Sequence, residues 1–202
     1  ASEEMQERIS GIKGSFRCVL ESITNAQKAG YQGELHTVPM KINIEYIHDL
    51  IELAKKINID RLSILRYVPQ GRGTDLLTPS LDQYKKMLEI VEKITKKKNS
   101  ICIRLGAPFN MLNENSSKCS AGFGKLLISA HGEVLPCEAF KFLRESQPNI
   151  YDDDILNIWK NGELLNKIRN IRENDKERCS KGCLGQKLLC CGDLIEGVDP
   201  IC

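Results

Sequence analysis

The residues of this 202-residue chain best suited to chemistry are its nine cysteines. Six of them lie at or after Cys137, and four of those fall between Cys179 and Cys191. An odd number fits a full disulfide set poorly, and the first residues lack the charged-then-apolar pattern of a secretory signal. In a reducing cytosol, clustered thiols bind a metal or an iron–sulfur cluster more often than one another. We therefore predict a cytoplasmic protein whose C-terminal part binds metal through sulfur.

The spacing of these thiols favours iron–sulfur clusters. Cys119 is followed after twelve residues by Gly132, and Gly132 after four more by Cys137. The glycine allows a β-hairpin to turn, which would return Cys137 towards Cys119. A cluster needs four sulfurs when ligation is complete. A tetrahedral zinc site accepts the same ligand type, but six or more thiols exceed what one zinc ion needs.

This pattern resembles the SPASM extension of radical S-adenosylmethionine (SAM) enzymes, which carry auxiliary iron–sulfur clusters and mostly modify peptides and proteins. The resemblance rests on three stretches of the C-terminal part: Cys119-x12-Gly132-x4-Cys137, Cys179-x3-Cys183, and Gly192-Asp193 through Asp199-Pro200-x-Cys202. It reaches upstream to Gly11-Ile-Lys-Gly-Ser-Phe16, Asn43 and Arg66-x-Val-Pro-x-Gly71. The similarity therefore spans nearly the whole chain.

The resemblance implies cofactors and a reaction for the parent enzyme. Reductive cleavage of SAM would make a 5′-deoxyadenosyl radical that abstracts hydrogen from a peptide or protein side chain. One or two auxiliary [4Fe-4S] clusters would accept the electron or anchor the substrate. Their implied ligands are Cys119, Cys137, Cys179, Cys183, Cys190, Cys191 and Cys202. The implied SAM contacts are Val38, Asn43, Leu65 and Arg66.

The chain departs from the family pattern in two places. The Cys-x3-Cys-x2-Cys motif that binds the SAM-cleaving cluster is absent. The resemblance implies that it lies on strands before Ala1, so this chain alone should be inactive. The usual Cys-x2-Cys-x5-Cys-x3-Cys group appears here as Cys179-x3-Cys183-x6-Cys190, immediately followed by Cys191. The ligand can therefore be either Cys190 or Cys191.

Glu138 is the candidate catalytic residue. It follows Cys137 directly, and in related sulfatase-maturing enzymes an acidic residue at that position is the proposed base that takes the substrate proton. The alternative is a surface glutamate at the end of a strand. Cys18 and Cys102 fall inside a predicted helix and a predicted strand. We expect both to be small buried hydrophobic residues without a role.

The first 112 residues predict an α/β fold. Apolar residues recur with the helical period in three segments, 15–29, 44–57 and 78–94. Strand patterns alternate with them at 34–38, 61–68 and 101–105. Such an alternation gives a parallel sheet with its ligand loops where the strands end. Since the chain opens on an apparent loop feeding a helix, we interpret residues 1–112 as the second half of a partial (β/α) radical SAM barrel.

Residues 113–202 predict a small cysteine-rich α+β SPASM domain. Its expected elements are a β-hairpin over 125–135 and one helix over 155–171, and the remainder is expected to be cysteine-rich loop.

The net charge, the lengths of the apolar runs and the expected unpaired strand edge indicate which kinds of partner the chain can have. A net charge of +2 gives no support for nucleic-acid binding, and no apolar run is long enough to span a membrane. We expect a peptide or protein substrate. A half-barrel leaves a strand edge unpaired, so we also expect either the missing N-terminal half or self-association. The alternative to an enzyme is a non-catalytic, zinc-stapled peptide-binding or scaffold module.

Overall fold

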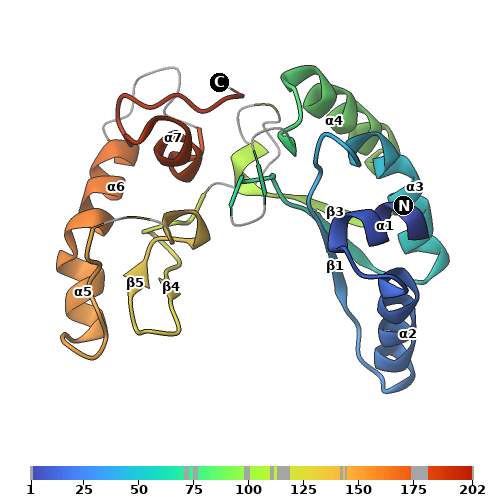
Figure 1. The fold of residues 1–202 in the computed structure, drawn as a ribbon, viewed down its shortest axis with the longest axis horizontal. Helices are drawn as coiled ribbons and strands as arrows, with labels where there is room; N and C mark the ends of the chain where they lie inside the picture. Colours follow the sequence, from blue (N-terminus) through green and yellow to red (C-terminus); the bar gives the residue numbers. More distant parts are fainter. Residues whose placement is uncertain are drawn as a thin grey trace. The chain divides into compact units, whose positions relative to one another are not determined.

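The computed structural model divides the chain into two compact units, an N-terminal unit of Ala1–Ser116 and a C-terminal unit of Ser117–Cys202 (Figure 1). The structure describes residues 2–70, 73–74, 77–97, 101–109, 112, 119–141, 143, 145–173 and 182–201. The predicted domain boundary after residue 112 borders residues 113–118, which lie outside this set. Within the described residues, every helix is too short or too polar to cross a bilayer.

The N-terminal unit alternates helices with three parallel strands in the order β1-β2-β3, which confirms the predicted parallel sheet. Its elements are α1 (Glu3–Ser10), α2 (Ser15–Lys28), β1 (Glu34–Thr37), η1 (Ile44–Tyr46), α3 (Ile47–Lys56), β2 (Arg61–Ile64), α4 (Leu81–Thr95), β3 (Cys102–Leu105) and η3 (Ala107–Phe109).

The core of this unit lies on one face of the sheet. Leu62 and Ile64 of β2 point to this face and are fully buried, as is Ile51 of α3. Tyr84 of α4 meets Phe109 of η3 edge to face, with ring centroids 5.5 Å apart. Because side chains alternate along a strand, the neighbours of these buried residues point to the opposite face.

The first helix differs from the prediction. The segment predicted as an opening loop is helix α1, whose first turn is capped by Ser2, since its Oγ accepts the Met5 N–H at 3.2 Å. The next helix, α2, begins at Ser15, where the predicted segment 15–29 begins. Its N-cap is Gly14, whose N–H donates to the Glu7 carboxylate.

Helix α2 was predicted correctly, but none of its residues is buried. A cavity of about 300 Å³ separates it from β1 and α3, lined on the helix side by Phe16, Leu20 and Ile23. The apolar stripe of α2 therefore faces the core layer without packing tightly against it.

The C-terminal unit contains a hairpin followed by helices (Figure 1). Its elements are β4 (Leu127–Ile128), β5 (Val134–Leu135), η4 (Glu138–Phe140), α5 (Ile155–Asn161), α6 (Glu163–Glu173) and α7 (Leu184–Cys191). Strands β4 and β5 pair antiparallel, as the hairpin pattern predicts. Val134, Ile158 and Leu165 form the buried centre of a core cluster against which Leu126, Ile155 and Trp159 pack.

Two predictions for this unit were wrong. The single helix expected over 155–171 is divided at Gly162, whose extended backbone (φ −57°, ψ 126°) ends α5 before α6 begins. The stretch expected to be cysteine-rich loop contains helix α7, which ends at Gly192 in the left-handed conformation (φ 73°). Glycine adopts that conformation without steric cost, so Gly192 is a favourable helix stop.

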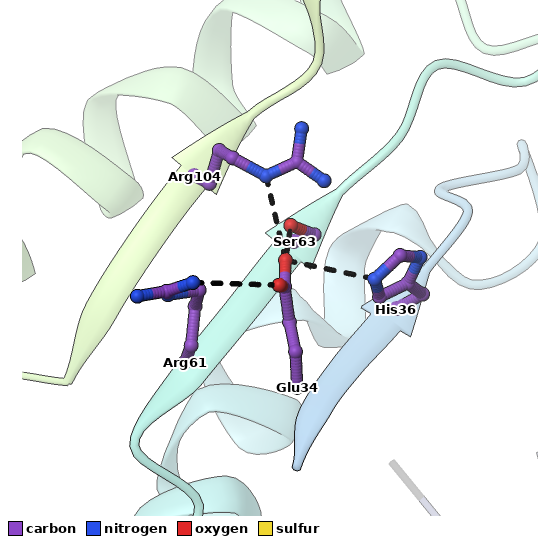
Figure 2. A network of polar contacts seen from close by, with 5 residues as sticks. All are labelled: Glu34, His36, Arg61, Ser63 and Arg104. Atoms are coloured by element: carbon purple, nitrogen blue, oxygen red, sulfur yellow. Dashed lines mark hydrogen bonds and ion pairs between the residues drawn. The ribbon is translucent and has the colours of Figure 1, made fainter.

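The second face of the parallel sheet carries a polar network centred on Glu34 (Figure 2). Its carboxylate accepts a hydrogen bond from Ser63 and lies 3.4 Å from Arg104 Nε, so it joins all three strands. Arg61 and His36 approach it at 3.9 and 3.6 Å. The hydrogen bond from Ser63, followed by the contacts with Arg104, holds the pKa of Glu34 below its usual range.

We predict that Glu34→Gln lowers the thermal midpoint at pH 7 and that the loss shrinks as the pH falls through about 4. A carboxyl whose pKa is lower in the folded state stabilises the fold above its ordinary pKa, and this contribution is lost on acidification. Thermal unfolding followed by circular dichroism from pH 7 to pH 3 measures it. Glu45→Gln, at an exposed position in η1, is the control. An unchanged gap between wild type and Glu34→Gln at all pH values would contradict the prediction.

Candidate metal centre

The hairpin brings two of the predicted metal ligands towards each other. Gly132 lies at its turn with φ 83°, and a Cβ there would overlap Asn149 Oδ1 and the Tyr151 ring. Cys137 follows β5 as the N-cap of η4. Burial raises the pKa of the Cys137 thiol, and the thiol of Cys119 lies near enough to raise it further. The structure therefore places Cys119 and Cys137 in one neighbourhood, as the Gly132 spacing implied.

Cys183 approaches the same neighbourhood from the C-terminal segment. It is the N-cap of α7, and α7 packs against η4, the short helix that follows Cys137. The contact depends on Gly185: a Cβ at this position would overlap the Cβ of Ala139 and would lie 3.8 Å from Cys183 Sγ. A helix N-terminus favours the thiolate form of a cysteine, which is the form that binds metal.

A buried carboxylate ties Cys183 to the end of the chain. Asp199 is fully buried; its Oδ2 accepts the Cys183 N–H at 2.7 Å and its Oδ1 accepts the Ile201 N–H at 3.1 Å. Ile201 directly precedes Cys202. Because charge-assisted hydrogen bonds are among the stronger ones, Asp199 holds together the two loops that carry these cysteines.

Helix α6 supports the loops beside two of the cysteines. Arg169 Nε donates to the Gly122 carbonyl at 2.8 Å, just after Cys119. Arg172 donates to the Gly182 carbonyl at 2.8 Å, just before Cys183. Arg169 also lies over the Trp159 ring at 4.6 Å. Arg169 and Arg172 are three residues apart on one helix, so they link two segments far apart in the sequence.

The two cysteines whose assignment the sequence leaves open lie at the far end of α7. Cys190 Sγ is 3.9 Å from Gln186 Oε1, and Cys191 Sγ accepts the Val198 N–H at 3.4 Å. Two helical turns, or ~10 Å along the axis, separate Cys190 from Cys183. Cys183 and Cys190 therefore lie at opposite ends of one helix.

Two further predicted ligands, Cys179 and Cys202, lie outside the described residues. Within the part of the chain that the structure describes, no three side chains of the His, Cys, Asp or Glu type are grouped closely enough to hold a metal ion.

Glu138, the predicted base, lies beside Cys137 at the start of η4. Its side chain is 57% exposed and accepts a hydrogen bond from Lys141 Nζ at 2.7 Å. This contact joins two side chains of the same short segment, three residues apart.

Cys18 and Cys102 are both exposed, so the expectation that they are buried was wrong. Cys18 lies on α2, which buries no residue, and Cys102 is the first residue of β3 on the polar face of the sheet. In both cases the polar or open environment overrides the usual preference of cysteine for the interior.

The predicted SAM contacts lie just after the C-terminal ends of strands in the parallel sheet. Val38 follows β1, and Leu65 and Arg66 follow β2, where parallel strands end side by side. The Leu65 N–H donates to the Thr37 carbonyl at 2.8 Å. Asn43 lies at the N-terminus of η1, and its side chain closes the loop after β1. Its Oδ1 accepts the Met40 N–H at 2.6 Å and its Nδ2 donates to the Val38 carbonyl at 3.2 Å.

Gly185, Arg172 and the bridging role of Asp199 were not identified from the sequence. The only available signal was the acidic residue in Asp199-Pro200, which could accept hydrogen bonds from loop amides. The partners of all three residues lie in other segments of the chain, and no local pattern indicates such contacts.

Comparison with known protein families finds a match within the C-terminal unit. Residues 119–184 match the SPASM family, described as an iron–sulfur cluster-binding domain. The whole chain is 25% identical to an AdoMet-dependent heme synthase of Methanosarcina barkeri (strain Fusaro / DSM 804) and covers 64% of it. It is 24% identical to a PqqA peptide cyclase of Rhizobium meliloti (strain 1021) and covers 57% of it. The chain thus spans less than two thirds of the length of these relatives.

Solved structures share the fold. The crystal structure of Streptococcus suis SuiB matches 95% of this chain over 50% of its own length, with a TM-score of 0.71 and 20% identity. SuiB bound to the precursor peptide SuiA matches with a TM-score of 0.72. Together these matches confirm the resemblance predicted from the cysteine spacing: residues 119–184 match the SPASM iron–sulfur cluster-binding family, and the whole chain is similar to AdoMet-dependent heme synthase and shares the fold of SuiB.

Proposed function

We propose that this chain is the C-terminal part of a radical SAM maturase that modifies a peptide or protein side chain, and that its C-terminal unit holds one or two auxiliary iron–sulfur clusters. The observation that carries the proposal is the approach of three cysteines from distant segments. Cys119 and Cys137 neighbour each other across the hairpin, and the packing of α7 on η4 brings in Cys183. Relatives named as a peptide cyclase, and a similar fold solved with a precursor peptide, support a peptide substrate.

The residues present fit such a cofactor. Thiolates are the ligands that iron–sulfur clusters require, and Gly185 leaves room where any side chain would push α7 away from η4. Cys179, Cys202 and one of Cys190 and Cys191 would supply the further sulfurs. When bound, the auxiliary clusters would accept an electron or anchor the substrate.

The remaining site residues divide between two tasks. The Glu138 carboxylate would take the proton from the substrate, and the hydrogen bond from Lys141 would orient it. Val38, Asn43, Leu65 and Arg66 would contact SAM at the edge where the strands end, the usual place for ligands in a parallel α/β fold. The chain alone would not start the reaction, because it lacks the Cys-x3-Cys-x2-Cys motif.

The first test of this proposal is metal content. After anaerobic reconstitution with iron and sulfide, the chain should absorb in the visible region, and Cys137→Ser and Cys183→Ser should lower both absorbance and iron content. Cys102→Ser, which removes an exposed thiol from the parallel sheet, should leave both unchanged. Stoichiometric zinc with no iron uptake would instead support the zinc-stapled scaffold module.

The second prediction concerns the contact that positions Cys183. Gly185→Ala should lower iron content and thermal stability, because the added methyl overlaps Ala139 and overpacking costs about 1–3 kcal/mol. The gain in helix propensity, about 1 kcal/mol at most, acts in the opposite direction. Gly124→Ala is the matched control, since its Cβ would lie 3.6 Å from Ser120 Cβ, an ordinary contact. Full iron content in Gly185→Ala would show that the close approach is not needed.

The third prediction concerns Glu138 in the enzyme with its complete radical SAM domain. Glu138→Gln should keep iron content and SAM cleavage but slow product formation by about 10²–10⁴-fold, the usual contribution of a general base. Glu145→Gln, which removes an exposed carboxylate further along the chain, serves as the control. Cys137→Ala should lose cluster as well as product. A normal rate in Glu138→Gln would assign this residue to the surface.

A further inference from the structure

The parallel sheet presents an open polar face that the proposed cluster chemistry does not use. Six side chains share it by alternation along the strands: Glu34, His36, Arg61, Ser63, Cys102 and Arg104. Parallel sheets are normally covered by apolar side chains on both faces, and closed barrels fill their interior with branched apolar residues. This face has charged side chains instead, and those of His36, Arg61 and Arg104 are 53%, 59% and 46% exposed. Such a surface suits a polar ligand better than a packed core.

Glu34 organises this face from its centre. Its Oε1 contacts Arg104 through Nε at 3.4 Å, and a terminal amino group of the same guanidinium points away from the carboxylate (Figure 2). Ser63, which is fully buried, donates to the same carboxylate and holds it in place. Glu34 therefore holds one edge of the Arg104 guanidinium, and the other edge faces a possible ligand.

The charges on this face favour an anion. Arg61 and Arg104 bring two positive charges against the single negative charge of Glu34, with His36 counted as neutral. A guanidinium binds a carboxylate through two parallel hydrogen bonds, with better geometry than a lysine ammonium can offer. The face can thus accept one further carboxylate beside Glu34.

We propose that this polar face binds an acidic side chain of the substrate peptide, with Arg104 and Arg61 as the binding residues and Glu34 as the residue that positions Arg104. This inference rests on the proposed function in taking the substrate to be a peptide. The carboxylate of SAM is the other source of the same chemistry. Glu34 and Arg61, however, begin β1 and β2, at the opposite ends of these strands from Val38 and Leu65, where the cofactor is proposed to lie. Arg104 lies nearer the end of β3, but its Nε contacts Glu34, the first residue of β1.

Fluorescence anisotropy tests the proposal. It compares how tightly the 202-residue chain binds a fluorescein-labelled peptide containing two glutamates and its twin, in which both glutamates are replaced by glutamine. The acidic peptide should bind more tightly than its twin. Arg104→Gln should weaken the acidic peptide about tenfold, the size of one charged hydrogen bond, and leave the twin unchanged. Arg61→Gln should act in the same direction and provides a second variant should Arg104→Gln unfold. Lys96→Gln, which makes the same charge change on the exposed end of α4, should have no effect.

A second measurement locates the bound peptide. Cys102 is the register partner of Arg61 and is exposed, so the acidic peptide should slow its alkylation, as followed by mass spectrometry. Equal affinity for the two peptides, unchanged binding in both arginine variants, an unprotected Cys102, or displacement of the acidic peptide by SAM would each overturn the proposal. Iron content reports on the cluster proposal independently, because none of these variants touches a cysteine of the C-terminal unit.

Discussion

The candidate metal centre depends on one close contact, the packing of α7 against η4. Only a residue without a side chain fits at Gly185, because the Cβ of Ala139 occupies the space beside it. The contact sets the N-terminus of α7, and with it Cys183, beside the short helix that begins after Cys137. This contact, together with the hydrogen bonds from α6, fixes the relation between the hairpin and the C-terminal segment.

Hydrogen bonds to the backbone reinforce this contact from two directions. Asp199 accepts amide hydrogens from Cys183 and Ile201, and Arg172 donates to the carbonyl of Gly182. In these hydrogen bonds the groups on the cysteine-bearing segments are backbone amides and carbonyls, so the bonds position the loops themselves. A unit of this size has little apolar core, and hydrogen bonds of this kind supply part of the order that a larger core would otherwise provide.

The N-terminal unit distributes its chemistry differently, over the two faces and two ends of a sheet. One face is apolar and packs against α3 and α4, whereas the other carries the network around Glu34. The strand ends near Val38 and Leu65 hold the proposed cofactor contacts, and the polar face around Glu34 holds the proposed carboxylate site. A cofactor and a peptide could thus occupy one sheet without competing for the same side chains.

The sequence by itself determined the helices and strands with clear periodicity, the hairpin around Gly132 and the sulfur chemistry of the C-terminal part, because each depends on residues close together in the chain. The sequence did not predict the break at Gly162 or helix α7, because capping and packing decided both features. Only the tertiary structure decided which cysteines meet, that Gly185 must lack a side chain, and that Glu34, Arg61 and Arg104 share one open face. Those contacts join distant segments, and no local pattern encodes them.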